Sequence, residues 1–268
     1  MRKFVFITAA VYLAISCNRS PKNLDYELVP YSGDLKVESF DSTVVDENRF
    51  NYNNRIFKVG SSYTYNYQYR TADGQAKNFR FTEEDWEFKE PENSDQNNLT
   101  IEVSSGLKPF SDWYPDYNQT VMKYIYSNKE SYELTGLIEN EANIWLHPPR
   151  EGLFRIMELN PFPSVQFPLE IGNTWQWSVA AGEQWSDERW TTWEGNVKNT
   201  MTYEILSKST INSKWGELET WAIEGEATNR LGTTLLEATY HDSLGFVNMH
   251  FTNIDGSTLE FDLADVDY

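Results

Sequence analysis

Four tyrosines at alternate positions form the most restrictive pattern in this sequence. They occupy positions 63, 65, 67 and 69, and the positions between them carry the polar residues Thr64, Asn66, Gln68 and Arg70. Successive side chains of a β-strand point to opposite faces of a sheet, so this stretch can bury an aromatic face and expose a polar one. The pattern therefore predicts a half-buried strand.

The beginning of this strand has a counterpart 112 residues later in the chain. Val59 to Asn66 and Ile171 to Ser178 share a β-branched residue, a glycine, two small polar residues and then alternating aromatic and polar residues. We interpret the likeness as an internal repeat, which predicts either a duplicated domain or two halves of one barrel-like sheet. The alternative is a coincidence of two ordinary strand starts.

A proline-rich stretch lies between the two patterns. Residues 144–168 contain five of the ten prolines in the chain. Pro148 and Pro149 cannot donate ladder hydrogen bonds, so no central strand continues through them. Glu151 to Leu159 has apolar residues at near-helical spacing and fits a short helix or a strand. We predict that residues 144–168 form a hinge between two β-rich units.

The C-terminal part of the chain has the most regular strand pattern. Strand-like runs separated by turn residues occur at 202–206, 217–227, 233–240, 245–252 and 257–263. Such spacing is typical of an antiparallel meander, sandwich or barrel. The predicted fold is mainly β, with antiparallel sheets in two similar halves, half-barrel or sandwich-like, that span 55–143 and 169–268 and are joined by the hinge.

The charge of the chain excludes one class of partner. Hydrophobic residues make up 40% of the 268 positions and aromatic residues 15%, which is enough for a buried core and argues against a disordered chain. The formal net charge is −19. A surface of that sign repels phosphate backbones, so no nucleic-acid partner is expected. It also repels anionic lipid, so membrane attachment would need a covalent anchor.

The N-terminus predicts export. Arg2 and Lys3 precede an apolar run of twelve residues, 4–15, which is too short for a membrane-spanning helix but suits a secretory signal. The only cysteine, Cys17, follows Ala14-Ile15-Ser16 and leaves no partner for a disulfide. The AISC sequence resembles a lipobox of the type found in Bacteroidota lipoproteins, in which the cysteine becomes the lipidated N-terminus. An ordinary signal peptide with an incidental cysteine is the alternative.

This resemblance implies an anchored protein. Residues 1–16 would be the signal peptide, 17–54 a lipidated tether and polar lead-in, and the lipid bilayer a partner through acylated Cys17. Surface-exported lipoproteins of this type resemble one another in having acidic residues just after the cysteine, whereas the first acid here is Asp25. The expected location is therefore the bacterial outer membrane, facing the periplasm rather than the cell surface.

A second resemblance concerns the body of the chain. The two aromatic strand starts, together with the run from Tyr240 to Val247 that leads into a further strand, resemble uncharacterised periplasmic β-proteins of the domain-of-unknown-function type. The resemblance implies a half-barrel built on a curved sheet. It brings no catalytic residues with it.

The tetrapeptide His147-Pro148-Pro149-Arg150 is the first candidate site. Because prolines fix the backbone, His147 and Arg150 would be held rigidly, and a guanidinium can bind a carboxylate through two parallel hydrogen bonds. The motif suits an anion-binding site, and it also suits an internal salt bridge that closes the hinge. The three histidines of the chain have no metal-binding spacing, and the chain has no GxSxG, P-loop or Rossmann glycine pattern. We therefore predict no metal, cofactor or catalytic residue.

The acidic stretch 183–194 is the second candidate site. It contains the three tryptophans Trp185, Trp190 and Trp193 beside the four acids Glu183, Asp187, Glu188 and Glu194. Exposed tryptophans beside carboxylates can hold sugar rings, and two carboxylates at a suitable separation can hydrolyse a glycoside. Packing in the core or at a sheet edge is the alternative use of the tryptophans.

These observations favour a non-enzymatic, membrane-anchored lipoprotein that acts as an envelope binding or scaffold module. Its ligand would be an apolar molecule in the curved sheet, a glycan on the tryptophan loop, or another envelope protein. The alternative is a glycan-binding or glycan-hydrolysing lipoprotein that uses residues 183–194.

The lipid anchor is directly testable. Radiolabelled palmitate should enter the protein expressed with its leader, and Cys17→Ser should abolish the labelling and release the protein from the membrane fraction. Equal labelling of the wild type and the variant would contradict the assignment of Cys17.

Overall fold

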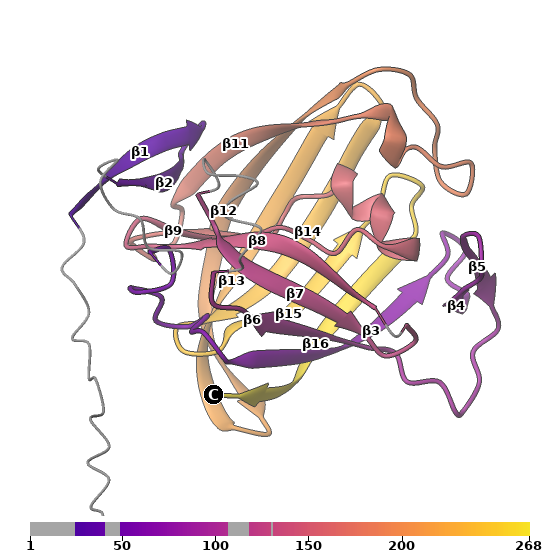
Figure 1. The fold of residues 1–268 in the computed structure, drawn as a ribbon, viewed down its shortest axis with the longest axis horizontal. Helices are drawn as coiled ribbons and strands as arrows, with labels where there is room; N and C mark the ends of the chain where they lie inside the picture. Colours follow the sequence, from indigo (N-terminus) through magenta and orange to yellow (C-terminus); the bar gives the residue numbers. More distant parts are fainter. Residues whose placement is uncertain (1–24, 41–48, 107–117, 130) are drawn as a thin grey trace, which may run out of the picture.

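The computed structural model describes residues 25–40, 49–106, 118–129 and 131–268 (Figure 1). The predicted signal peptide and Cys17 lie outside the described residues. None of the helices in the described ranges is long and apolar enough to cross a membrane.

The main structure is one antiparallel sheet that curls into a nearly closed barrel (Figure 1). Its N-terminal strands are β3 (Ser62–Arg70), β6 (Asn98–Val103), β7 (Thr120–Tyr126), β8 (Tyr132–Glu139), β9 (Asn143–Leu146) and β10 (Ser164–Gln166). Its C-terminal strands are β11 (Thr174–Ala181), β12 (Val197–Ser213), β13 (Gly216–Asn229), β14 (Gly232–His241), β15 (Gly245–Thr252) and β16 (Thr258–Asp267). The predicted fold class, mainly β with antiparallel sheets, is confirmed.

The order of the strands places each half of the chain on one side of the barrel. The sheet runs β10-β9-β8-β7-β6-β3 and continues as β16-β15-β14-β13-β12-β11. A short hairpin, β4 (Ala76–Phe81) and β5 (Trp86–Lys89), branches from β3. The first and last strands of the barrel are therefore neighbours, and β10 and β11 are the edges of the described sheet.

Strand β3 is where the two halves meet. Its four tyrosines are between 0% and 6% exposed, and they point into the barrel as the alternation predicted. The β3 backbone pairs with β16 on one side, where Tyr67 lies opposite Phe261, and with β6 on the other, where Tyr65 lies opposite Leu99. Two of the hydroxyls donate to buried backbone carbonyls: that of Tyr63 to Ile56 at 2.5 Å, and that of Tyr65 to Phe246 at 2.8 Å. The strand thus supplies both backbone pairing and core.

Aromatic side chains fill the interior of the barrel. The 3-10 helix η1 (Gly152–Leu159) places Phe154, which is fully buried, against four rings. The ring centroid of Phe154 lies 5.1 Å from that of Tyr67, 5.5 Å from Phe79, 5.7 Å from Tyr126 and 5.9 Å from Phe261. The curved sheet is therefore packed with side chains around η1.

The predicted hinge is part of the sheet. Within residues 144–168, β9 and β10 pair antiparallel, with Trp145 opposite Ser164, and η1 connects them. The prolines Pro148 and Pro149 follow the end of β9, as their missing donors require. Gly152 has a φ of 59°, and a Cβ there would lie 2.8 Å from the ring of Phe79, so only glycine lets the chain enter η1 at this point.

The two aromatic strand starts have the same local geometry. Gly60 and Gly172 have φ angles of 88° and 84°. The Gly60 amide donates to Val103 at 2.9 Å, and the Gly172 amide donates to Ile205 at 2.8 Å. The bonds are returned one residue later: the Val103 amide donates to the carbonyl of Ser61 at 3.0 Å, and the Ile205 amide donates to the carbonyl of Asn173 at 3.0 Å. Duplication of a whole half stays a prediction.

A small hairpin bridges the open seam of the barrel. Strands β1 (Tyr26–Ser32) and β2 (Leu35–Phe40) form their own two-stranded sheet. On one side of the seam, the amide of Asp34 donates to the carbonyl of Gln176 in β11 at 2.8 Å. On the other, the side chain of Gln166 in β10 donates to the carbonyl of Asp34 at 3.4 Å, and the amide of Lys36 donates to the side chain of Asn143 in β9 at 2.9 Å. The hairpin therefore joins edges that do not pair with each other.

The packing of η1 predicts a large effect of Phe154→Ala. Removing a fully buried aromatic side chain leaves a cavity, so the free energy of unfolding should fall by about 3–5 kcal/mol, measured by urea denaturation. Ile171→Ala is the control, because that side chain is 64% exposed and its loss should change stability by less than about 0.5 kcal/mol. Equal effects of the two substitutions would show that the segment does not contribute to the core.

Candidate functional site

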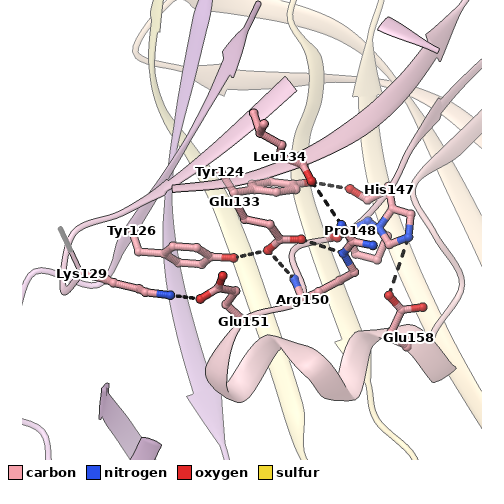
Figure 2. Close-up of polar contacts among 10 residues, drawn as sticks. All are labelled: Tyr124, Tyr126, Lys129, Glu133, Leu134, His147, Pro148, Arg150, Glu151 and Glu158. Atoms are coloured by element: carbon pink, nitrogen blue, oxygen red, sulfur yellow. Dashed lines mark hydrogen bonds and ion pairs between the residues drawn. The ribbon is translucent and has the colours of Figure 1, made fainter. Parts of the chain in front are cut away.

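A buried polar cluster lies beneath β7 and β8, beside η1 (Figure 2). We call it the inner polar cluster, and its members are Tyr124, Tyr126, Glu133, His147, Arg150 and Glu158. The prolines after β9 turn the chain from the sheet toward η1, so His147 and Arg150 come to face Glu133 of β8 and Glu158 of η1. The structure therefore brings the two predicted residues together with two acids that the sequence did not single out.

Arg150 is bound to Glu133 through both its side chain and its backbone. Its Nε donates to Glu133 Oε1 at 2.7 Å, and its amide donates to Oε2 at 2.9 Å. The Tyr126 hydroxyl also donates to Oε2, at 2.6 Å. The Glu133 side chain is only 7% exposed, so its charge is enclosed and compensated by three donors. Removal of Arg150 would leave the buried Glu133 carboxylate without its positive partner.

His147 is held as a neutral ring. Its Nδ1 lies 2.8 Å from the carbonyl of Pro148, and its own carbonyl accepts a hydrogen bond from Tyr124 at 2.7 Å. The ring packs against Phe162, with centroids 4.8 Å apart. Burial, together with the nearby Arg150 charge, lowers the pKa of His147 to about 3. The ring is therefore uncharged at neutral pH.

Glu158 is a buried acid that keeps its proton. Its side chain is 6% exposed, and its Oε1 lies 3.6 Å from His147 Nε2 without a hydrogen-bond partner. Burial raises the pKa of Glu158 to about 7; Arg150 opposes the rise and Glu133 adds to it. The contact with His147 is therefore one between neutral groups in mildly acidic solution, and it is not a fixed ion pair.

The tryptophans of residues 183–194 have separate surroundings. Trp193 is 7% exposed and packs with Leu159 and Val197. Trp190 stacks on Trp86, with centroids 6.0 Å apart and planes 17° apart. Packing is thus what holds these two rings in place.

Trp185 is the member of this group that meets the inner polar cluster. It ends the short helix η2 (Glu183–Trp185) and is half-buried. Its ring lies 5.9 Å from the guanidinium carbon of Arg150 and 6.0 Å from that of Arg155. The two candidate sites, which are separate in the sequence, therefore adjoin each other at this ring.

The acids of residues 183–194 have different partners. The side chain of Glu183 accepts a hydrogen bond from the amide of Gly195 at 2.6 Å. Asp187 is paired with Arg189, whose Nε donates to it at 2.7 Å. Burial raises the pKa of Asp187, but the hydrogen bonds and charge of Arg189 outweigh it and leave the pKa below its ordinary value. Asp187 is therefore a fixed negative charge. Glu188 and Glu194 are exposed.

The acids of the inner polar cluster had one weak signal in the sequence. Glu133 occupies the same strand face as the buried Thr135 and Leu137, so the alternation of β8 turns it inward. Glu158 had no such signal, because η1 is buried on nearly every side. In the described part of the chain, no group of three or more His, Cys, Asp or Glu side chains could hold a metal.

An open groove of about 650 Å³ lies beside the edge strand β11. It is lined by Ser32 and Gly33 of the hairpin, by residues 176–180 of β11, and by Lys198 and Thr200 of β12. Gln176 and Ser178 use their backbone groups to bind the hairpin. Because backbone groups alternate along a strand, the amide and carbonyl of Ala180 point to the same edge, and Ala180 is exposed.

The raised pKa of Glu158 predicts a pH effect with a definite sign. In the folded chain the carboxyl keeps its proton up to about pH 7, whereas an ordinary glutamate loses it near 4.5. The contribution of the Glu158 carboxyl to the free energy of unfolding is therefore complete below pH 4.5 and is lost as the pH rises through 7. Relative to Glu158→Gln, the unfolding free energy of the wild type should fall by about 1.4 kcal/mol per pH unit in this window.

Urea denaturation at several pH values measures this difference. His147 titrates in the opposite direction, but it is present in both proteins and cancels in the comparison. Glu183→Gln, at an exposed position, is the control and should follow the wild type. A stability difference between the wild type and Glu158→Gln that does not change with pH would contradict the prediction.

Comparison with known proteins gives only distant likenesses. No family model matches the chain, and no curated protein matches it in sequence. It is similar to a presumed exported protein with a YmcC-like fold from Bacteroides fragilis, at 11% identity and a TM-score of 0.43 over 80% of this chain and 98% of that one. It is also similar to a presumed lipoprotein from Parabacteroides distasonis, at 9% identity and a TM-score of 0.43 over 79% and 97% of the two chains. It is similar as well to the hypothetical lipoprotein YmcC from Escherichia coli, at 10% identity and a TM-score of 0.35 over 84% of this chain and 92% of that one. Likeness at this level carries no inference about activity or ligand.

Proposed function

We propose that the protein is anchored in the bacterial envelope through acylated Cys17 and acts as a non-enzymatic binding or scaffold module. The lipobox-like sequence before Cys17 supports the anchor. The packing of the described residues supports a binding role on the outside of the barrel, since aromatic side chains occupy the interior. The outer membrane, with the body facing the periplasm, remains the preferred location because Asp25 is the first acid after Cys17.

The exposed edge of β11 carries this proposal. In the described sheet no strand pairs with β11 on the side away from β12, and the hairpin occupies only residues 176 and 178 there. Beyond the hairpin, the groove leaves the backbone at Ala180 accessible. An edge of this kind can accept an extended peptide as an additional strand, which forms main-chain hydrogen bonds to it. The partner would be an envelope protein that presents such a segment.

The alternatives have less support from the geometry. An apolar ligand inside the curved sheet would have to displace the rings around Phe154. A glycoside hydrolase needs a carboxyl group with a raised pKa to protonate the leaving group. Among the acids of residues 183–194, Asp187 has the opposite shift, and Arg189 holds it in place. A sugar site on Trp185 stays a prediction.

Ala180→Pro tests the edge directly. Proline removes the amide that points away from β12, and an edge position tolerates it, so the fold should persist while partner binding falls at least tenfold. Ala180→Ser is the matched control, because it alters the side chain and keeps the amide. The measurement is the yield of partner crosslinked to each protein in intact cells. Both variants should unfold at the same temperature as the wild type, which shows that the fold has persisted. Full crosslinking of Ala180→Pro would overturn the proposal.

A further inference from the structure

The three most exposed aliphatic side chains of the described residues lie at one end of the barrel. Ile171 is 64% exposed, Val59 46% and Leu206 45%. Val59 and Ile171 directly precede the glycines of the two equivalent strand starts, and Leu206 follows Ile205, which exchanges backbone hydrogen bonds with the second of these starts. Apolar side chains scattered singly over a surface need no explanation, whereas three on one rim indicate a surface that a partner covers.

Strand pairing and direction place these side chains on the same rim. Strand β3 begins where β16 ends, because Ser62 lies opposite Asp267. Strand β11 begins at Thr174, which lies opposite Glu204 of β12. All neighbours from β12 to β16 are antiparallel, so β12 and β16 run in the same direction, and β3 and β11 both begin at the end of the barrel toward which they run. We call this end, which carries the letter C in Figure 1, the anchor-side rim.

The start of strand β1 is bound to the same rim. Strand β8 ends and β9 begins there, and Glu141 lies in the turn between them. The hydroxyl of Tyr26, the first residue of β1, donates to Glu141 Oε2 at 2.6 Å. Tyr26 follows Cys17 by nine positions, a connection that spans at most about 30 Å. An acyl chain on Cys17 therefore keeps the anchor-side rim close to the bilayer.

We propose that the anchor-side rim lies on the surface of a zwitterionic lipid bilayer, with Val59, Ile171 and Leu206 in contact with lipid. This inference rests on the proposed acylation of Cys17, which brings the bilayer within reach. Apolar side chains that enter the boundary between headgroups and acyl chains add to the attachment that a lipid anchor provides. The three side chains would thus orient the barrel on the membrane as well as strengthen its attachment.

The turn between β12 and β13 supplies an aromatic side chain to the same rim. Lys214 in this turn pairs with Asp265 near the end of β16, at 2.6 Å, so the turn lies beside that end. The Nζ of Lys214 is 4.7 Å from the ring centroid of Trp215, which is half-buried. Tryptophan is enriched at membrane interfaces, and a lysine can lie along apolar surface while its charge stays in water.

The charge of the chain restricts the lipid that the rim can contact. The formal net charge is −19, and the exposed acid Glu170 directly precedes Ile171. Such a surface repels anionic headgroups, so the contact depends on apolar side chains. A zwitterionic headgroup fits this rim better than an anionic one.

Fluorescence quenching in the reconstituted lipoprotein tests the contact. The protein, expressed with its leader, is inserted into vesicles of phosphatidylcholine and phosphatidylethanolamine and labelled at one introduced cysteine, since acylation blocks the sulfur of the only native cysteine, Cys17. A dye on Ile171→Cys or Leu206→Cys should lose about half of its emission or more when the lipids are brominated near the top of their acyl chains. Leu235→Cys is the matched control, because Leu235 is 39% exposed and lies near the start of β14, at the opposite end of the barrel. Its emission should not change.

Flotation of the same vesicles distinguishes failure of the anchor from failure of the rim contact. A protein that does not float with the vesicles would overturn both. A protein that floats but is quenched no more at Ile171→Cys than at Leu235→Cys would overturn the rim contact alone, and would favour a protein partner on this rim instead.

A second substitution checks that the rim itself makes the contact. Ile171→Glu places a charge at an exposed position, so the fold should persist while the quenching of a dye on Leu206→Cys falls by about half or more. Leu235→Glu, at the opposite end, should leave that quenching unchanged. Equal quenching of the Leu206→Cys dye in the two charged variants would contradict the proposed contact.

Discussion

The pairing of β3 with β16 is the interaction on which the rest of the structure depends. It joins a strand near the start of the body to the last strand of the chain, so that two consecutive antiparallel meanders become one sheet. Without it, each meander would expose another unpaired edge and half of an aromatic core. The tyrosines of β3 therefore serve two purposes: their backbone joins the halves, and their rings occupy the interior that the joined sheet encloses.

Helix η1 completes that interior and thereby creates the inner polar cluster. Strands β9 and β10 are neighbours in the sheet, so the chain between them must return over the barrel. This connection contains η1, in which every residue except Arg155 is buried. A helix surrounded by protein has no solvent-facing side on which to place an acid, so Glu158 is buried with the apolar residues. Arg150 and Glu133 neutralise each other beside it, whereas Glu158 Oε1 has no hydrogen-bond partner and burial raises the pKa of this carboxyl to about 7.

Local patterns predicted the strands well, and long-range contacts explain what they missed. The alternation of Tyr63 to Tyr69 was sufficient because a strand with one buried face has period two. The hinge prediction recognised the prolines correctly but could not foresee that Trp145 pairs opposite Ser164, since that register depends on both strands joining a larger sheet. Trp190 was predicted as a possible sugar contact from its residue type, and the sequence could not show that it stacks on Trp86, 104 positions earlier in the chain. Residue type was sufficient to single out these side chains as candidates, whereas their neighbours are determined by the tertiary structure.

Chain length places the open seam near the membrane if Cys17 carries the lipid. Strand β1 begins at Tyr26, nine positions after Cys17. Fully extended, that connection spans at most about 30 Å. The β1–β2 hairpin is hydrogen-bonded to β11, so the groove beside Ala180 is tied to the same short connection. A partner strand that adds to β11, as proposed, would then bind within reach of the bilayer.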